Sequence, residues 1–206
     1  GFMAGALAMI ALLGVMSYLK DSVKSEEDVE EKLDTTLFGV LSHESPYRNL
    51  KSRIKRQKKR MLITEPSVSF GFVETVKKMR TKLLYKSSKD GDKVLLVTST
   101  AKCEGKTTVA VNLALAMAQR KKKILLIEGD LRKTGLAELL GVTVPKGAGL
   151  GDNLGQQKKL ESLVFQMEGS SLYLLTNNVS HTRSTEFLAS KQFEAFLEKM
   201  KQEMDY

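Results

Sequence analysis

The sequence contains very little cysteine: one residue, Cys103, in a chain of 206. One cysteine excludes a disulfide within the chain, which fits a reducing compartment. Hydrophobic residues make up 42% of the chain and charged residues 28%. This balance is that of a folded protein, and the length suits one domain with additional segments.

Charged residues are absent from residues 1–19, GFMAGALAMIALLGVMSYL. As a helix this stretch would span roughly 28 Å, close to the thickness of a bilayer's hydrocarbon core. A signal peptide would need a basic leader and a small-residue cleavage site, whereas the charged sequence KDSVKSEEDVEEKL follows. We therefore predict a transmembrane helix at residues 1–19, with a signal peptide or a buried core helix as alternatives. The first residue is glycine, so we expect a longer natural chain.

Acidic residues are absent from residues 51–60, KSRIKRQKKR, which carry seven of the nine net positive charges. The basicity is therefore a local patch, and the lack of interleaved aromatic residues argues against a nucleic-acid partner. The run either lies against anionic membrane lipids or is a solvated linker. Because the basic residues follow the apolar stretch, the positive-inside rule predicts a plasma-membrane protein whose C-terminal part is cytoplasmic.

From residue 61 the pattern is typical of an α/β domain, after a juxtamembrane linker at residues 20–60. Short apolar runs predict strands buried on both faces, and longer runs with apolar residues at helical spacing predict helices. Strands that alternate with helices indicate a doubly wound parallel sheet. The expected strands lie at residues 93–100, 123–130 and 171–176, and the expected helices at residues 69–85, 107–120 and 184–204.

A phosphate-binding loop is predicted at the sequence AKCEGKTT, although Thr100 stands where the usual pattern has its first glycine. The loop follows a predicted strand and opens a predicted helix, as such loops do. Backbone N–H groups at a helix N-terminus favour phosphates. Gly105 would let the backbone turn closely, Lys106 would supply a charge to the phosphates, and Thr107 would offer a hydroxyl to Mg²⁺.

Two acidic residues, Glu128 and Asp130, follow the next predicted strand, beginning 22 residues beyond Lys106. Ligands of doubly wound sheets bind at the carboxyl ends of the strands. These acids are therefore candidates to hold Mg²⁺ or to accept a proton from a hydroxyl nucleophile. The alternative is an ordinary polar turn.

The sequences VTSTAKCEGKTTVAVNLALAMAQ and ILLIEGDLRK together resemble the bacterial tyrosine kinases (BY-kinases) of capsule and exopolysaccharide export. The resemblance implies a P-loop NTPase fold of MinD/ParA-like topology with ATP and Mg²⁺ as cofactors. It also implies that the apolar helix ends a polysaccharide co-polymerase, or chain-length determinant, module. Lys102 and Cys103 stand where the family usually has proline and glycine, and Glu128 stands where it usually has aspartate.

The resemblance assigns roles to individual residues. Catalytic roles fall on Lys106, Glu128 and Asp130, and the Mg²⁺ ligands are Thr107 and Asp130. The nucleotide-binding residues are Ala101, Lys102, Cys103, Glu104, Gly105, Lys106, Thr107 and Thr108.

The sequence ETVKKMR resembles the family's E-x-x-R-x-x-R motif, which implies a ring-like homo-oligomer. Glu74 and Arg80 match this motif, and Lys77 replaces the middle arginine. Lysine cannot reproduce the two-pronged contact of arginine. The implied partners are other copies of the chain, membrane lipids, and the polymerase and export proteins of the polysaccharide.

The family's Walker B strand and tyrosine cluster would follow Tyr206, so the resemblance implies a kinase domain cut at both ends and inactive as residues 1–206. Two other functions stay open. One is a membrane-attached ATPase switch of the MinD/ParA type, although Ala101 stands where that group has its signature lysine. The other is a non-catalytic regulator of chain length.

Overall fold

The computed structural model describes residues 2–19, 26–33, 35–47, 49–55, 59–131, 135–150, 159–177 and 184–206, and the chain divides into two compact units. The first unit, Gly1–Val40, contains α1 (Phe2–Leu19) and α2 (Glu26–Leu33). Its helices lie where an uncharged run and a charged, helix-forming run occur in the sequence.

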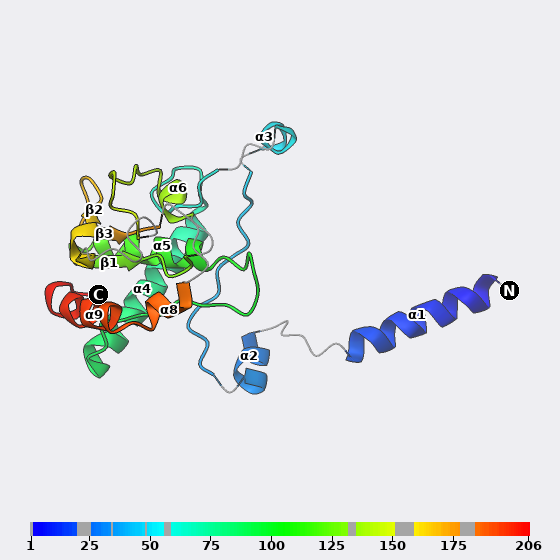
Figure 1. The fold of residues 1–206 in the computed structure, drawn as a ribbon. Coiled ribbons are helices and arrows are strands. Elements are labelled where there is room, and N and C mark those ends of the chain that lie inside the picture. Colours follow the sequence, from blue (N-terminus) through cyan, green and yellow to red (C-terminus); the bar gives the residue numbers. More distant parts are fainter. Residues whose placement is uncertain are drawn as a thin grey trace. The chain divides into compact units, whose positions relative to one another are not determined.

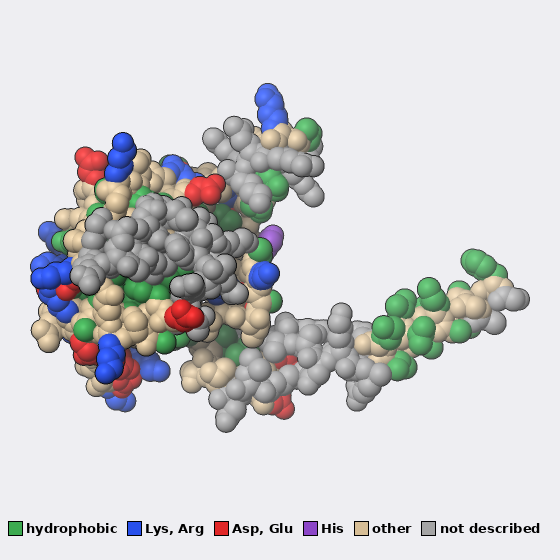
Figure 2. Space-filling view, in the orientation of Figure 1, with side chains coloured by type: hydrophobic (Ala, Val, Ile, Leu, Met, Phe, Trp, Pro, Cys, Tyr) green, Lys and Arg blue, Asp and Glu red, His purple; other side chains and the backbone are tan. Residues whose placement is uncertain are grey.

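Helix α1 is continuous, as the uncharged run predicts, and its large hydrophobic side chains from Phe2 to Met16 are exposed (Figure 2). Among the helices that the structure describes, none is both long enough and apolar enough to cross a membrane. The predicted transmembrane helix at residues 1–19 is therefore not supported.

The second unit, Leu41–Tyr206, is an α/β domain (Figure 1). Its elements follow in the order α3 (Leu50–Ile54), α4 (Phe70–Asp90), α5 (Lys106–Ala118), β1 (Ile124–Ile127), α6 (Leu136–Leu140), the 3-10 helix η1 (Leu160–Leu163), β2 (Phe165–Gln166), β3 (Leu172–Leu175), α8 (Ser184–Leu188) and α9 (Lys191–Glu203).

The described sheet has three strands in the order β1-β3-β2. Strands β1 and β3 are parallel, with Ile124 opposite Leu172 and Ile127 opposite Leu175. Strand β2 runs antiparallel to β3, so the sheet is mixed, and the expectation of a wholly parallel sheet is wrong at that edge. A short turn at residues 168–171 joins β2 to β3, and so short a connection permits only an antiparallel neighbour.

Helices cover both faces of the sheet. Successive strand residues point to opposite faces, so β1 and β3 each contribute side chains to both core clusters. Ile124 and Leu172 pack in one core cluster with residues of α5 and α6. Leu175 packs in a second cluster with residues of η1 and α9, on the side where Figure 1 shows α8 and α9. The predicted helices at 69–85 and 107–120 are confirmed as α4 and α5, and the second and third predicted strands as β1 and β3.

The strand expected at residues 93–100 is wrong for this structure, which assigns no strand there. Three of its apolar side chains are exposed, at 56% for Val94, 51% for Leu95 and 84% for Leu96, and Val97 is half-buried. A strand requires a hydrogen-bonded neighbour, and within the described residues none lies beside this run. The apolar pattern shows that the segment suits burial, but it does not supply the neighbouring strand.

The single helix expected at residues 184–204 is two helices, α8 and α9, because a new N-terminus forms at Ser190. The Ser190 hydroxyl accepts a hydrogen bond from the Phe193 N–H at 3.2 Å, which caps α9. The side chain of Ser184, the expected cap, lies outside the described residues.

Candidate functional site: the loop before helix α5

The predicted phosphate loop lies where α5 begins, and Lys106 is the first residue of that helix. The chain turns at residues 119–123 from α5 into β1, and the two elements pack against each other. They therefore run in opposite directions, so the N-terminus of α5 lies at the edge where β1 ends. Glu128 and Asp130 follow β1 at this same edge, as the sequence predicts.

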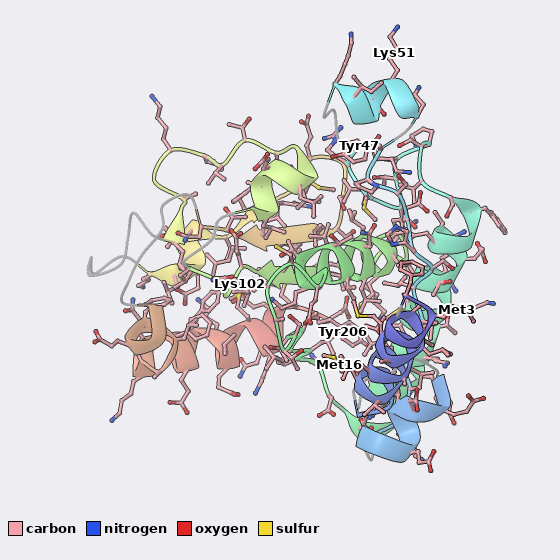
Figure 3. The ribbon with its side chains drawn as sticks, turned by 90° about the vertical axis from the view of Figure 1, so that its right-hand side faces the viewer. Met3, Met16, Tyr47, Lys51, Lys102 and Tyr206 are labelled. Carbon is pink, nitrogen blue, oxygen red and sulfur yellow. The ribbon has the colours of Figure 1, made fainter. Side chains whose placement is uncertain are left out.

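The loop turns through two residues in the left-handed region of backbone conformation. Gly105 has φ of 91°, which glycine adopts without strain. Cys103 has φ of 63°, which costs a residue with a side chain roughly 1–2 kcal/mol. Lys102, in the same loop, is exposed to solvent (Figure 3). The backbone conformation at position 103 is thus one that glycine would adopt more readily.

The side chains of Lys106 and Glu104 hold the loop together. The Lys106 ammonium donates to the Ser99 hydroxyl at 2.9 Å and to the Ala101 carbonyl at 3.3 Å. The Glu104 carboxylate accepts from the Ala101 N–H at 2.9 Å and from the Thr100 hydroxyl at 3.3 Å. The Ala101 N–H is the main cause of the lowered pKa of Glu104, with a smaller effect from the positive charge of Lys106.

Helix α5 begins without a side-chain cap, because its N-cap residue is Gly105. Helices α4 and α9, by contrast, are capped by serine hydroxyls. Within the described residues, the backbone N–H groups of residues 106–108 have no hydrogen-bond partner. These donors are the groups with which a helix N-terminus binds an anion, so the start of α5 is fitted to receive phosphate oxygens.

The two acidic residues after β1 lie in different environments. Glu128 is buried, at 9% exposure, and its carboxylate accepts backbone N–H groups from Gly135 at 2.8 Å, Leu136 at 3.0 Å and Asn177 at 2.8 Å. Asp130 is exposed. Strand and loop order alone cannot distinguish them, because both follow the same strand two residues apart.

The predicted Mg²⁺ ligands are two separate oxygen donors. The described residues contain no cluster of three or more His, Cys, Asp or Glu side chains that could hold a metal ion. The Thr107 hydroxyl, in the first turn of α5, and the exposed carboxylate of Asp130 are the donors that the sequence assigns to Mg²⁺. Both are oxygen donors, the type that Mg²⁺ prefers, and Mg²⁺ usually takes few protein ligands beside water and phosphate.

The sequence analysis missed two residues that position the loop and its helix. Ser99 accepts a hydrogen bond from the ammonium of Lys106. Asn112, fully buried in α5, accepts from the Ile63 N–H at 2.7 Å and donates to the carbonyls of Met61 at 2.7 Å and Thr108 at 2.8 Å. The signal for Asn112 was available, because a lone amide in the apolar run VAVNLALAMA must find partners when it is buried.

The predicted oligomerisation residues make contacts within the chain. The Lys77 ammonium and the Glu74 carboxylate form an ion pair at 2.8 Å on α4. Arg80 donates from Nη1 to the Ala116 carbonyl at 3.4 Å, and its buried Nε has no partner within the described residues. Arg80 thus lies against α5, and the ring-like oligomer stays a prediction.

The chain is similar in sequence to bacterial tyrosine kinases, although no protein-family model matches it. It is 27% identical to the tyrosine-protein kinase ptk of Acinetobacter johnsonii over 207 aligned positions, which cover all of this chain and 28% of that protein. It is 29% identical to the tyrosine-protein kinase wzc of Salmonella typhi over 140 positions, 68% of this chain and 19% of that protein. The tyrosine-protein kinase YwqD of Bacillus subtilis is 35% identical over 120 positions, 57% of this chain and 49% of that protein. The chain thus spans less than a third of the first two relatives.

The fold is that of BY-kinase domains. The BceF tyrosine kinase domain matches with a TM-score of 0.74 at 21% identity, covering 89% of this chain and 74% of that one. The kinase domain of the Escherichia coli tyrosine kinase ETK matches with a TM-score of 0.72 at 21% identity, covering 89% and 71%. The α/β fold expected from the sequence is therefore confirmed.

Proposed function

We propose that the protein is an ATP-dependent protein-tyrosine autokinase that regulates the chain length and export of a capsular polysaccharide or exopolysaccharide. The observation that carries this proposal is the start of α5: a lysine and three backbone N–H groups that have no partner among the described residues lie at the edge of the sheet where β1 ends. The sequence similarity to tyrosine kinases supports the reaction, and the BY-kinase fold supports the place of the site.

The chain's own residues would bind and orient the phosphates of ATP. The Lys106 ammonium exchanges its contacts with the neutral oxygens of Ser99 and Ala101 for contacts with the negatively charged phosphate groups. The N–H groups of residues 106–108 donate to the same oxygens, since the uncapped helix terminus holds them in place. Phosphoryl transfer needs little else from a protein than such positioning and charge stabilisation.

Thr107 and Asp130 are the residues that would hold Mg²⁺. When bound, Mg²⁺ supplies charge neutralisation at the phosphates. Asp130 suits this position because it is exposed at the sheet edge where β1 ends. The hydroxyl of Thr107 suits it because the first turn of α5 carries it.

The test is formation of phosphotyrosine. The natural full-length chain that contains this sequence is incubated with ATP and Mg²⁺, with a synthetic Glu/Tyr copolymer as an added acceptor, and phosphotyrosine is detected by immunoblot. We expect a signal that Lys106→Ala abolishes and that Lys78→Ala, which removes an exposed lysine of α4, leaves unchanged.

Two other results would assign another function. Release of phosphate from ATP without phosphotyrosine would show an ATPase switch of the MinD/ParA type. No reaction and no nucleotide binding would show a non-catalytic regulator of chain length.

The proposed location is the cytoplasmic side of the plasma membrane, with lipids, other copies of the chain and polysaccharide polymerase and export proteins as partners. Lys51 and Lys55 are exposed on and beside α3, so they are accessible to anionic headgroups (Figure 3 labels Lys51). Lys59 instead pairs with Glu44 at 2.5 Å, and residues 56–58 of the basic run lie outside the described residues.

A further inference from the structure

We infer that Glu128 is a positioning residue, which fixes the turn that carries Asp130, and that it is neither a metal ligand nor the base that accepts the tyrosine proton. This inference deepens the proposed function and rests on it only for the part that concerns Mg²⁺. The part that concerns the carboxylate's contacts stands on the geometry of the protein alone.

Both oxygens of the Glu128 carboxylate are already bound to the protein. Oε1 accepts from the N–H groups of Gly135 at 2.8 Å and Leu136 at 3.0 Å, where α6 begins. Oε2 accepts from the N–H of Asn177 at 2.8 Å, two residues beyond β3. Hydrogen bonds from backbone N–H groups to an ionised carboxylate are about twice as strong as neutral ones. Three of the roughly four lone-pair sites of the carboxylate are thus occupied, and the remaining one, on Oε2, belongs to a buried side chain.

Burial makes these bonds difficult to exchange. Glu128 is 9% exposed, and two of its donors, Leu136 and Asn177, belong to residues that are 2% exposed. If the carboxylate turned toward a ligand, these N–H groups would lose their partner in a place without water. An unpaired buried donor is costly, so the observed arrangement is strongly preferred.

The contacts enclose the turn that carries Asp130. On one side of that turn, the N–H of Glu128 donates to the Leu175 carbonyl at 2.9 Å, which continues the β1–β3 pairing. On the other side, the side-chain amide of Asn177 donates to the Leu131 carbonyl at 3.0 Å. The turn is therefore tied at one end to Leu175, the last residue of β3, and at the other end to Asn177, while Asp130 itself is exposed.

The length of the side chain explains the division of roles. Glutamate carries its carboxylate one methylene further than aspartate, about 1.5 Å, and this reach allows contact with α6 and the segment after β3 together. Of the two acids after β1, the buried one is thus a structural link. The other, Asp130, is exposed at the same edge of the sheet.

The first experiment measures the contacts in the unaltered protein by NMR. We expect scalar couplings across the hydrogen bonds from the amides of Gly135, Leu136 and Asn177 to the carboxyl carbon of Glu128. Because no substitution is needed, the result does not depend on whether a variant folds. Absence of these couplings in a well-resolved spectrum would overturn the inference.

The second experiment separates the two acids with matched amide variants. In Glu128→Gln, an NH₂ group replaces one acceptor oxygen and faces an N–H donor. We expect amide hydrogen exchange at Asn177, or at Gly135 and Leu136, to accelerate at least tenfold. The same amides should change less than twofold in Asp130→Asn.

The third measurement is the factor by which Mg²⁺ tightens ATP binding, taken for each variant relative to itself without Mg²⁺. We expect Glu128→Gln to keep this factor within twofold of the unaltered protein and Asp130→Asn to lose it. A Glu128→Gln protein that keeps its amide protection but loses the Mg²⁺ factor would show that Glu128 is a ligand, which overturns the inference. If ATP does not bind at all, the proposed function fails, while the couplings and the exchange rates still decide the role of Glu128.

Discussion

Replacing Asn112, a buried residue of α5, with alanine should destabilise the second unit. The side chain is fully buried and makes three hydrogen bonds, two of which hold residues 61–63 against the helix. Asn112→Ala leaves the Ile63 N–H and the Met61 carbonyl without these partners. The third partner, the Thr108 carbonyl, keeps its ordinary bond within the helix.

The magnitude follows from the two groups that lose their partners. A buried polar group without a partner costs about 1–3 kcal/mol, so two such groups cost about 2–6 kcal/mol. Partial relaxation of residues 61–63 toward water favours the lower half of this range. In a unit of this size, 3 kcal/mol corresponds to a fall in Tm of roughly 6–12 °C.

The assay is denaturant unfolding, with Asn49→Ala as the matched control. Asn49 is an exposed asparagine whose side chain accepts one hydrogen bond, from the Ser52 N–H at 2.8 Å. Its removal should cost less than about 1 kcal/mol, the typical value for a helix cap. Equal losses for the two variants, or a loss below about 1 kcal/mol for Asn112→Ala, would refute the view that Asn112 fastens residues 61–63 to α5.

Two further changes test the loop and the segment that precedes α4. Cys103→Gly should raise the free energy of unfolding by roughly 0.5–1 kcal/mol, since glycine adopts the left-handed conformation without a Cβ clash; a loss of stability on denaturant unfolding would contradict the strain assigned to this position. Glu44→Gln should lower it by about 1.5–3 kcal/mol at pH 7, because the carboxylate accepts hydrogen bonds from the Lys59 ammonium at 2.5 Å and the Ser69 hydroxyl at 2.6 Å. The hydrogen bond from Lys59 is the main cause of the lowered pKa of Glu44. The ionised carboxylate therefore contributes its full stabilisation of the folded state above the ordinary pKa of 4.5, and this stabilisation is lost as the pH falls through the lower pKa of the folded state. The stability difference between Glu44→Gln and the unaltered protein should therefore shrink below pH 4.5, and a difference that stays constant from pH 7 to pH 3 would contradict this assignment.

The elements that could be predicted are those whose own residues determine them. The apolar runs of β1 and β3 and the helical spacing of Phe72 and Val76 in α4 are visible in the sequence, and the structure buries these residues as expected. The order of strand and helix was also enough to place the start of α5 and Asp130 at one edge of the sheet. This follows because a short connection between a packed helix and strand permits only one direction.

The elements that could not be predicted depend on partners distant in the sequence. Leu96 lies in an apolar run of the kind that forms buried strands, yet no strand pairs with this segment within the described residues. The contact of Glu128 with Asn177 joins residues 49 positions apart, so a local pattern could not distinguish this buried carboxylate from the exposed Asp130. The break at Ser190 rests on one side-chain cap, in which the Ser190 hydroxyl accepts from the Phe193 N–H, and helical spacing does not reveal such a cap.

The central claim is that the start of α5 binds the phosphates of a nucleotide through Lys106. Its most direct test is calorimetric titration of ATP with Mg²⁺ into the unaltered protein, Lys106→Ala and Lys78→Ala. A hydrogen bond to a charged group contributes about 1.5–3 kcal/mol, so Lys106→Ala should weaken binding by roughly 10- to 150-fold. Lys78→Ala, on the exposed face of α4, should bind as the unaltered protein does. Equal affinity in all three proteins, or an equal loss in both variants, would contradict the account.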